Sequence, residues 1–114
     1  MWFSCFVLRP LASIGAYEEA FALITSKGEH SWYNMISEGA TTCYEAWGKE
    51  QKWNTSLCHP WASSPIIVMI ENFLGIKPSS FATGKLDMSP NMPKGLSVDI
   101  TLPTSKDKKL QISL

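Results

Sequence analysis

The residues SSPIIVMIENFLGIKP, numbered 63–78, contain the element around which the fold is expected to form. Ser64 followed by Pro65 is typical of a helix start, because a serine oxygen caps free backbone amides and proline fits the first helical position. Gly75 predicts a left-handed residue just after the helix, and Pro78 prevents the helix from continuing. We therefore expect a helix over residues 66–74.

The side chains of this helix are almost all apolar. Between residues 66 and 74 only Glu71 and Asn72 are polar. A helix that is apolar on every face is normally buried in a core. We expect this helix to be covered on nearly all sides, with the rest of the chain packed around it.

Two earlier helices are predicted in the stretch FSCFVLRPLASIGAYEEAFALI. Apolar side chains recur at helical spacing on both sides of Gly15, which predicts a helical hairpin that ends near Lys27 and Gly28. Pro10 lies inside the first pattern, so we expect a kink or an early end there. A loop or a short helical turn should follow over residues 29–39.

The character of the sequence changes after Pro78. Serine, threonine, glycine and proline interrupt residues 77–95, and the helical period disappears. Alternating apolar residues then predict strands over residues 96–102 and 110–114, with a third strand suggested over residues 84–88. The sequence thus predicts a mainly α chain with a short C-terminal β part.

The composition describes a globular chain without excess charge. Its 114 residues are 45% hydrophobic, and ten basic residues balance ten acidic ones. This balance gives no electrostatic reason to expect nucleic acid or a membrane surface as a partner. No apolar run approaches the roughly 20 residues of a membrane span, and the apolar start lacks the flanks of a signal peptide. Three cysteines at irregular spacing argue against a disulfide framework, which leaves a single bridge open.

Reactive side chains are concentrated just before the central helix, in GATTCYEAWGKEQKWNTSLCHPWASSP, residues 39–65. Thr42 and Glu45 have the spacing of a capping box, in which the glutamate bonds an amide at the helix start. A short helix is therefore expected to begin at Thr41 or Thr42, and on this interpretation Glu45 has a structural role. Residues 48–57 are polar and irregular.

Three chemical roles compete with that structural one. A zinc site would need Cys43, Cys58 and His59, but adjacent ligands point apart and no CxxC pair exists, so we expect no metal. A cysteine nucleophile lacks an elbow motif around it. Carbohydrate binding fits better, because the stretch offers aromatic rings and hydrogen-bonding side chains. Glycoside hydrolysis needs two carboxyl groups, and only one is evident here.

These residues, with ENFLGIKP after them, resemble the end of the catalytic domain of bacterial α-L-rhamnosidases, inverting enzymes built on a six-hairpin (α/α)6 barrel. The shared pattern is a Gly-Ala-Thr-Thr run, a glutamate beside an aromatic residue, a variable loop, a Cys-His pair and a Leu-Gly-Ile-Lys-Pro close. The stretch FVLRPLASIGAYEEAFALIT resembles the preceding helical hairpin, and HSWYNMISEGATT resembles the loop between them. The stretch SPNMPKGLSVDITLPTSKDKKLQISL resembles the start of the β-sandwich that follows the barrel.

The resemblance implies a fragment of a larger enzyme. Residues 1–78 would be the last helices of the (α/α)6 barrel, and residues 79–114 the first strands of the β-sandwich. Twelve barrel helices need on the order of 300 residues, and no residue here matches the family's upstream general acid. We expect the chain to be inactive alone, with two partners: the missing N-terminal part of the same enzyme and a rhamnose-containing glycan or glycoside.

The resemblance also implies roles for four residues. Glu45 would be the general base that activates water, His59 would bond sugar hydroxyls, and Trp32 and Trp47 would line the same pocket. No cofactor is implied, and the family works in the bacterial cytoplasm or periplasm. The competing hypothesis is a small non-enzymatic carbohydrate-binding or packing module, in which Glu45 only caps a helix.

Overall fold

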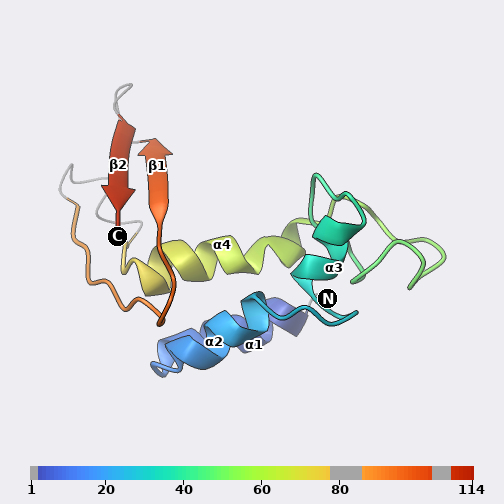
Figure 1. Cartoon of the computed structure of the whole chain (residues 1–114), viewed down its shortest axis with the longest axis horizontal. Helices are drawn as coiled ribbons and strands as arrows, with labels where there is room; N and C mark the ends of the chain where they lie inside the picture. Colours follow the sequence, from blue (N-terminus) through green and yellow to red (C-terminus); the bar gives the residue numbers. More distant parts are fainter. Residues whose placement is uncertain (1–2, 78–85, 104–108) are drawn as a thin grey trace.

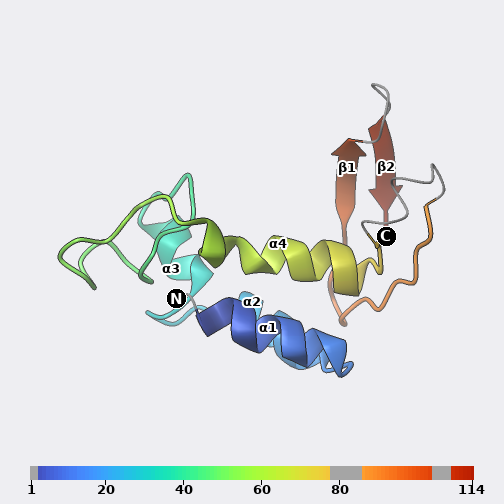
Figure 2. The same ribbon diagram turned by 180° about the vertical axis from the view of Figure 1, so that it is seen from behind.

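The computed structural model describes residues 3–77, 86–103 and 109–114. Helix α1 (Phe3–Ser13) and helix α2 (Tyr17–Ile24) form the predicted helical hairpin. The chain reverses at Gly15, whose φ of 83° lies in the left-handed region that glycine adopts without strain. Both helices lie along the same side of one longer helix (Figure 1, Figure 2).

The longer helix contains the predicted central one, but the predicted cap at Ser64 is wrong. The helix begins earlier, at Pro60, and the Ser64 hydroxyl lies 3.4 Å from the Ser4 hydroxyl instead. The helix has three consecutive segments. The 3-10 turn η1 (Pro60–Ser63) leads into α4 (Ser64–Val68), which continues into the π-helical segment η2 (Met69–Phe73). Gly75 follows with a φ of 65°, as predicted for the helix end. A Cβ atom at Gly75 would also lie 2.1 Å from the Ser89 carbonyl oxygen, so no larger residue fits without movement of the backbone.

The three helices share one apolar core. Its buried residues are Leu8, Ala12, Ala20, Val68 and Phe73. The rings of Tyr17 and Phe21 meet the Phe73 ring edge-on, with centroids 6.3 and 6.4 Å away. Edge-to-face pairs of this kind contribute about 0.5–1.5 kcal/mol beyond the area that they bury. Phe73 therefore joins both N-terminal helices to the end of the long helix.

A two-stranded antiparallel sheet stands beside the end of the long helix that Gly75 closes (Figure 1). Strand β1 (Asp99–Pro103) pairs with β2 (Lys109–Ser113), and both overlap the ranges predicted from alternation. Buried residues of both strands pack on the residues that follow the helix; this second cluster contains Leu74, Ile76, Leu102 and Ile112. The mainly α chain with a short C-terminal β part is confirmed.

The early helix end predicted at Pro10 is wrong. Helix α1 runs through Pro10 to Ser13. Proline removes only its own amide donor, and the N–H of Ile14 still bonds to the Pro10 carbonyl at 3.1 Å. The missing Pro10 amide therefore does not end the helix. Helix α2 ends at Ile24 rather than near Lys27.

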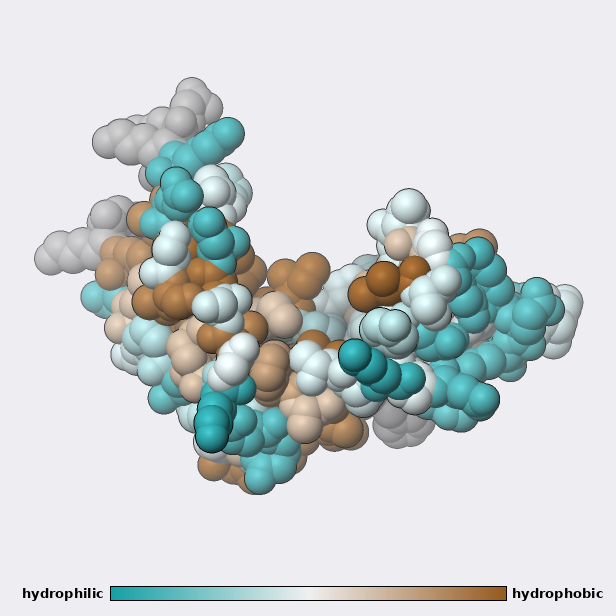
Figure 3. All heavy atoms as spheres, viewed as in Figure 1, coloured by the Kyte–Doolittle hydropathy of each residue, from teal (hydrophilic) through white to brown (hydrophobic). Residues whose placement is uncertain are grey.

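The expected burial of the central helix on nearly all sides is also wrong. Ile66 is 59% exposed and Ile67 is 38% exposed, because α1 and α2 lie along one side of the helix. Apolar surface is visible over the helices and at the base of the two strands (Figure 3). The opposite end of the molecule, which contains the loop after α3, is mainly hydrophilic. Of the suggested third strand, residues 84–85 lie outside the described residues, and residues 86–88 form no strand.

Candidate functional site

The candidate site is built at the other end of the long helix, from α3 and the loop after it (Figure 1). Helix α3 (Trp32–Ser37) is the short helical turn predicted from the sequence. Its N-cap is Ser31, which is fully buried and accepts a hydrogen bond from the Asn34 N–H at 3.1 Å. This cap fixes Trp32 in the first position of the helix.

The loop after α3 is closed by bonds between its two ends. The Glu45 N–H donates to the Ser56 carbonyl at 2.8 Å, and the His59 N–H donates to the Cys43 carbonyl at 2.8 Å. The two ends therefore run antiparallel beside each other. The chain between them is irregular, as predicted for residues 48–57.

The helix start predicted at Thr41 or Thr42 is wrong, and with it the capping box. Residues 39–59 contain no helix. The carboxylate of Glu45 accepts a hydrogen bond at 3.2 Å from the N–H of Ser56, which lies 11 residues later in the chain. The Thr-x-x-Glu spacing predicts a bond between residues close in the sequence. Here Glu45 instead bonds the amide of Ser56 on the other side of the loop.

Glu45 is held as a carboxylate by two donors. Its Oε1 atom lies 2.5 Å from Lys52 Nζ, and its Oε2 atom accepts from Ser56. The hydrogen bond from Lys52 and the amide of Ser56 lower the pKa of the Glu45 carboxyl below its ordinary value, and the charges of Lys52 and His59 lower it further. Desolvation opposes this shift, but its effect is smaller than that of either hydrogen bond. Glu45 is therefore ionised at neutral pH.

Trp32 and Trp47 pack against each other. Their ring centroids lie 4.9 Å apart at an interplanar angle of 90°, and Trp32 Nε1 donates to the Ala62 carbonyl at 2.7 Å. The indole of Trp32 thus bridges the loop and the start of the long helix. Both rings line a cavity of about 260 Å³, whose other lining residues come from α1, α2 and the segment between α2 and α3.

Hydrogen bonds from α3 hold the loop near Trp47 in place. Asn34 Nδ2 donates to the Trp47 carbonyl at 2.8 Å, and the Glu38 carboxylate accepts from the Lys49 N–H at 2.9 Å. A Cβ atom at Gly48 would lie 2.7 Å from Glu38 Oε1. The loop approaches α3 too closely for a larger residue, unless Glu38 moves.

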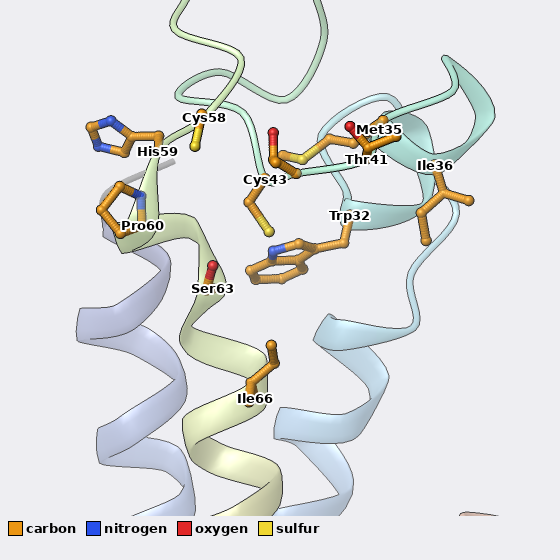
Figure 4. A pocket seen from close by; sticks show the side chains of 12 residues that line it. Trp32, Met35, Ile36, Thr41, Cys43, Cys58, His59, Pro60, Ser63 and Ile66 are labelled. Carbon is orange, nitrogen blue, oxygen red and sulfur yellow. The ribbon is translucent and has the colours of Figure 1, made fainter.

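A larger cavity of about 640 Å³ opens between α3, the loop and the long helix (Figure 4). Its lining residues are Trp32, Met35, Ile36, Ala40, Thr41, Thr42, Cys43, Cys58, His59, Pro60, Ser63 and Ile66. The Trp32 ring lies in the middle of this view, and His59 lies at one rim with its ring turned away from the indole. The cavity offers apolar and aromatic walls with a few polar groups at the edge, which is typical of small-molecule sites.

The structure places the four candidate residues at one end of the molecule but not in one pocket. Trp32 and His59 line the larger cavity, and Trp47 lines the smaller one on the other side of Trp32. Glu45 lines neither cavity, yet it is close enough for the charge of His59 to affect its pKa. Sequence reasoning missed Lys52, since no local spacing marks the cation that pairs with Glu45.

Within the described ranges, no group of three or more His, Cys, Asp or Glu side chains is arranged to hold a metal ion. In the same part of the chain, no helix has the length and apolar character to cross a membrane.

A comparison with protein families finds a glycosidase domain in this chain. Residues 4–73 match the family described as bacterial alpha-L-rhamnosidase 6 hairpin glycosidase domain. The match covers more than half of the chain, so the chain belongs to this family. The predicted relationship to rhamnosidases is confirmed. Comparisons with curated proteins and with solved structures found no match.

Proposed function

We propose that this chain supplies the water-activating side of an inverting glycosidase site that removes terminal α-L-rhamnosyl residues. The observation that carries the proposal is the ionised carboxylate of Glu45, which Lys52 and Ser56 hold outside the cavity, within electrostatic reach of His59 at the cavity rim. A general base must be deprotonated before it can accept a proton from water. The two bonds use two of about four acceptor positions of a carboxylate, which leaves room for a water molecule.

In this proposal the sugar lies in the larger cavity, and each residue has one task. Glu45 takes a proton from the attacking water, His59 bonds a sugar hydroxyl, and Trp32 forms an apolar wall with Trp47 behind it. The leaving oxygen is protonated by a general acid about 6.5–9.5 Å from the base, the spacing that admits water in inverting enzymes. That acid is supplied by the upstream part of the barrel, so the chain alone is inactive.

The division of the chain belongs to the same proposal. Residues 1–78 form the end of the (α/α)6 barrel, and residues 79–114 open the β-sandwich that follows. The exposed Ile66 and Ile67 on the long helix support this division, because a barrel packs its helices on more than one side. The partners are thus the upstream part of the enzyme and a rhamnose-containing glycan or glycoside.

A titration of the chain with L-rhamnose tests the sugar pocket. Tryptophan fluorescence is recorded in a Trp53→Phe background, because Trp53 is 95% exposed and would mask the pocket tryptophans. We expect a saturable change with L-rhamnose, a weaker one with D-glucose, and loss of affinity in His59→Ala. Glu45→Gln should bind within a few-fold of the parent, since the base acts on water. An equal response to both sugars, or none, would refute the pocket.

One observation favours a second candidate function. The bonds of Glu45 to Lys52 and Ser56 would serve equally well to close the loop of a non-enzymatic carbohydrate-binding or packing module. The two functions differ in the product. The assembled inverting enzyme must release β-L-rhamnose first from an α-L-rhamnoside, which proton NMR detects before the anomers equilibrate. Release of the α-anomer would exclude inversion, and failure to hydrolyse in the assembled enzyme would favour the module.

A further inference from the structure

We propose that Cys43 and Cys58 form a redox-active dithiol that closes to a disulfide across the ends of the site loop. Neither cysteine is used in the proposed reaction, and all three cysteines of the chain are free thiols in this structure. The inference rests on two observations, the pairing of the backbone and the shared cavity. It does not depend on the glycosidase proposal.

Hydrogen bonds between the loop ends bring the two cysteines onto facing segments. The N–H of Glu45 donates to the Ser56 carbonyl at 2.8 Å. Cys43 lies two residues before Glu45, and Cys58 lies two residues after Ser56. A disulfide requires α-carbons about 4.4–6.8 Å apart. The hydrogen bonds between the loop ends therefore bring the two cysteines near each other.

A second hydrogen bond limits the separation independently. The N–H of His59, the residue after Cys58, donates to the carbonyl oxygen of Cys43 itself at 2.8 Å. Standard covalent geometry then keeps the α-carbons of the two cysteines within about 7.6 Å, a limit reached only if all the connecting vectors lie in line. The Thr42 hydroxyl also donates to the Leu57 carbonyl, which holds the same two segments together.

The two thiols also lie on the same face of the loop. Both cysteines line the larger cavity, and Figure 4 shows their side chains at the same end of it. A bridge requires side chains that approach each other, and the shared cavity is consistent with this. The two thiols differ in exposure: Cys58 is exposed and Cys43 is partly buried. Cys58 is thus the thiol that an external reagent reaches first.

The oxidant is a low-molecular-weight disulfide such as oxidised glutathione. The Cys58 thiolate attacks one sulfur of the reagent, breaks its S–S bond and releases one thiol. The Cys43 thiolate then attacks Cys58 Sγ in the mixed disulfide and releases the second thiol. Two cysteine thiols are oxidised, one external disulfide is reduced, and the two protons leave on the released thiols. The bridge would fix both ends of the loop that carries Glu45.

Thiol counting and peptide mapping of the 114-residue chain test the proposal. The chain is equilibrated with reduced and oxidised glutathione at low protein concentration, alkylated, digested and analysed by mass spectrometry. We expect the number of free thiols to fall from three to one, the mass to fall by two hydrogen atoms, and one cross-linked peptide pair joining Cys43 to Cys58. Dithiothreitol should reverse all three changes.

Single substitutions provide the matched controls. Cys5→Ser removes the cysteine of α1 and should leave the bridge intact, whereas Cys43→Ser and Cys58→Ser should each abolish it. Cys43→Ser should instead accumulate a glutathione adduct on Cys58. Three free thiols in the oxidised wild-type chain, a stable adduct on Cys58 without a bridge, or a bridge that includes Cys5 would each overturn the proposal. The wild-type map decides the question even if a variant fails to fold.

Discussion

Replacement of Trp32 by phenylalanine should destabilise the chain by about 1.5–3 kcal/mol. The change removes the hydrogen bond from Trp32 Nε1 to the carbonyl of Ala62, a residue with no exposed surface. An unpaired buried acceptor costs about 1–3 kcal/mol. The edge-to-face contact with Trp47, worth about 0.5–1.5 kcal/mol, is only partly kept by the smaller ring.

Urea unfolding followed by near-UV circular dichroism measures this loss. Trp53→Phe is the matched control, because it makes the same chemical change at a side chain that is 95% exposed. Surface substitutions of this kind usually change the free energy of unfolding by less than about 0.5 kcal/mol. Equal stability of the two variants would refute the bridging role assigned to Trp32. A transition that was not cooperative in the parent chain would show that the contacts described here do not form a stable unit.

Four further predictions concern charge, backbone and surface. Lys52→Met should raise the pKa of Glu45 in an NMR titration, and an unchanged pKa would exclude the ion pair. Because folding lowers that pKa, the stability from Glu45 is complete above about pH 4.5 and is lost as the pH falls through the lower folded value; Glu45→Gln should lack this dependence. Gly75→Ala should lower the urea midpoint sharply, since its φ is 65° and its Cβ would meet Ser89. Ile66→Lys should reduce binding of an apolar dye without loss of stability, because Ile66 is 59% exposed.

The elements that the sequence predicts well are those specified by local signals. The long helix has its glycine end at Gly75, and the helical hairpin has its reversal at Gly15. The strands follow from alternation alone, because each needs only one buried face. For these elements, the residues that determine the conformation are neighbours in the chain.

Most of the wrong predictions concern features that depend on residues far away in the sequence. Thr42 and Glu45 have the spacing of a capping box, yet the backbone amide that bonds the Glu45 carboxylate belongs to Ser56. Pro10 is compatible with its helix, which continues to Ser13. The exposure of Ile66 depends on which neighbours pack around the long helix, and no periodicity within the helix contains that information.

Turnover of an aryl α-L-rhamnoside by the assembled enzyme, in which this chain is combined with the upstream part of the barrel, tests the central claim most directly. Glu45→Gln keeps the shape of the side chain but cannot accept a proton from water, so kcat should fall by about 10²–10⁴-fold while KM changes little. Glu50→Gln, an exposed glutamate in the same loop, should leave both values unchanged. Full activity of Glu45→Gln would contradict the role of Glu45 as general base.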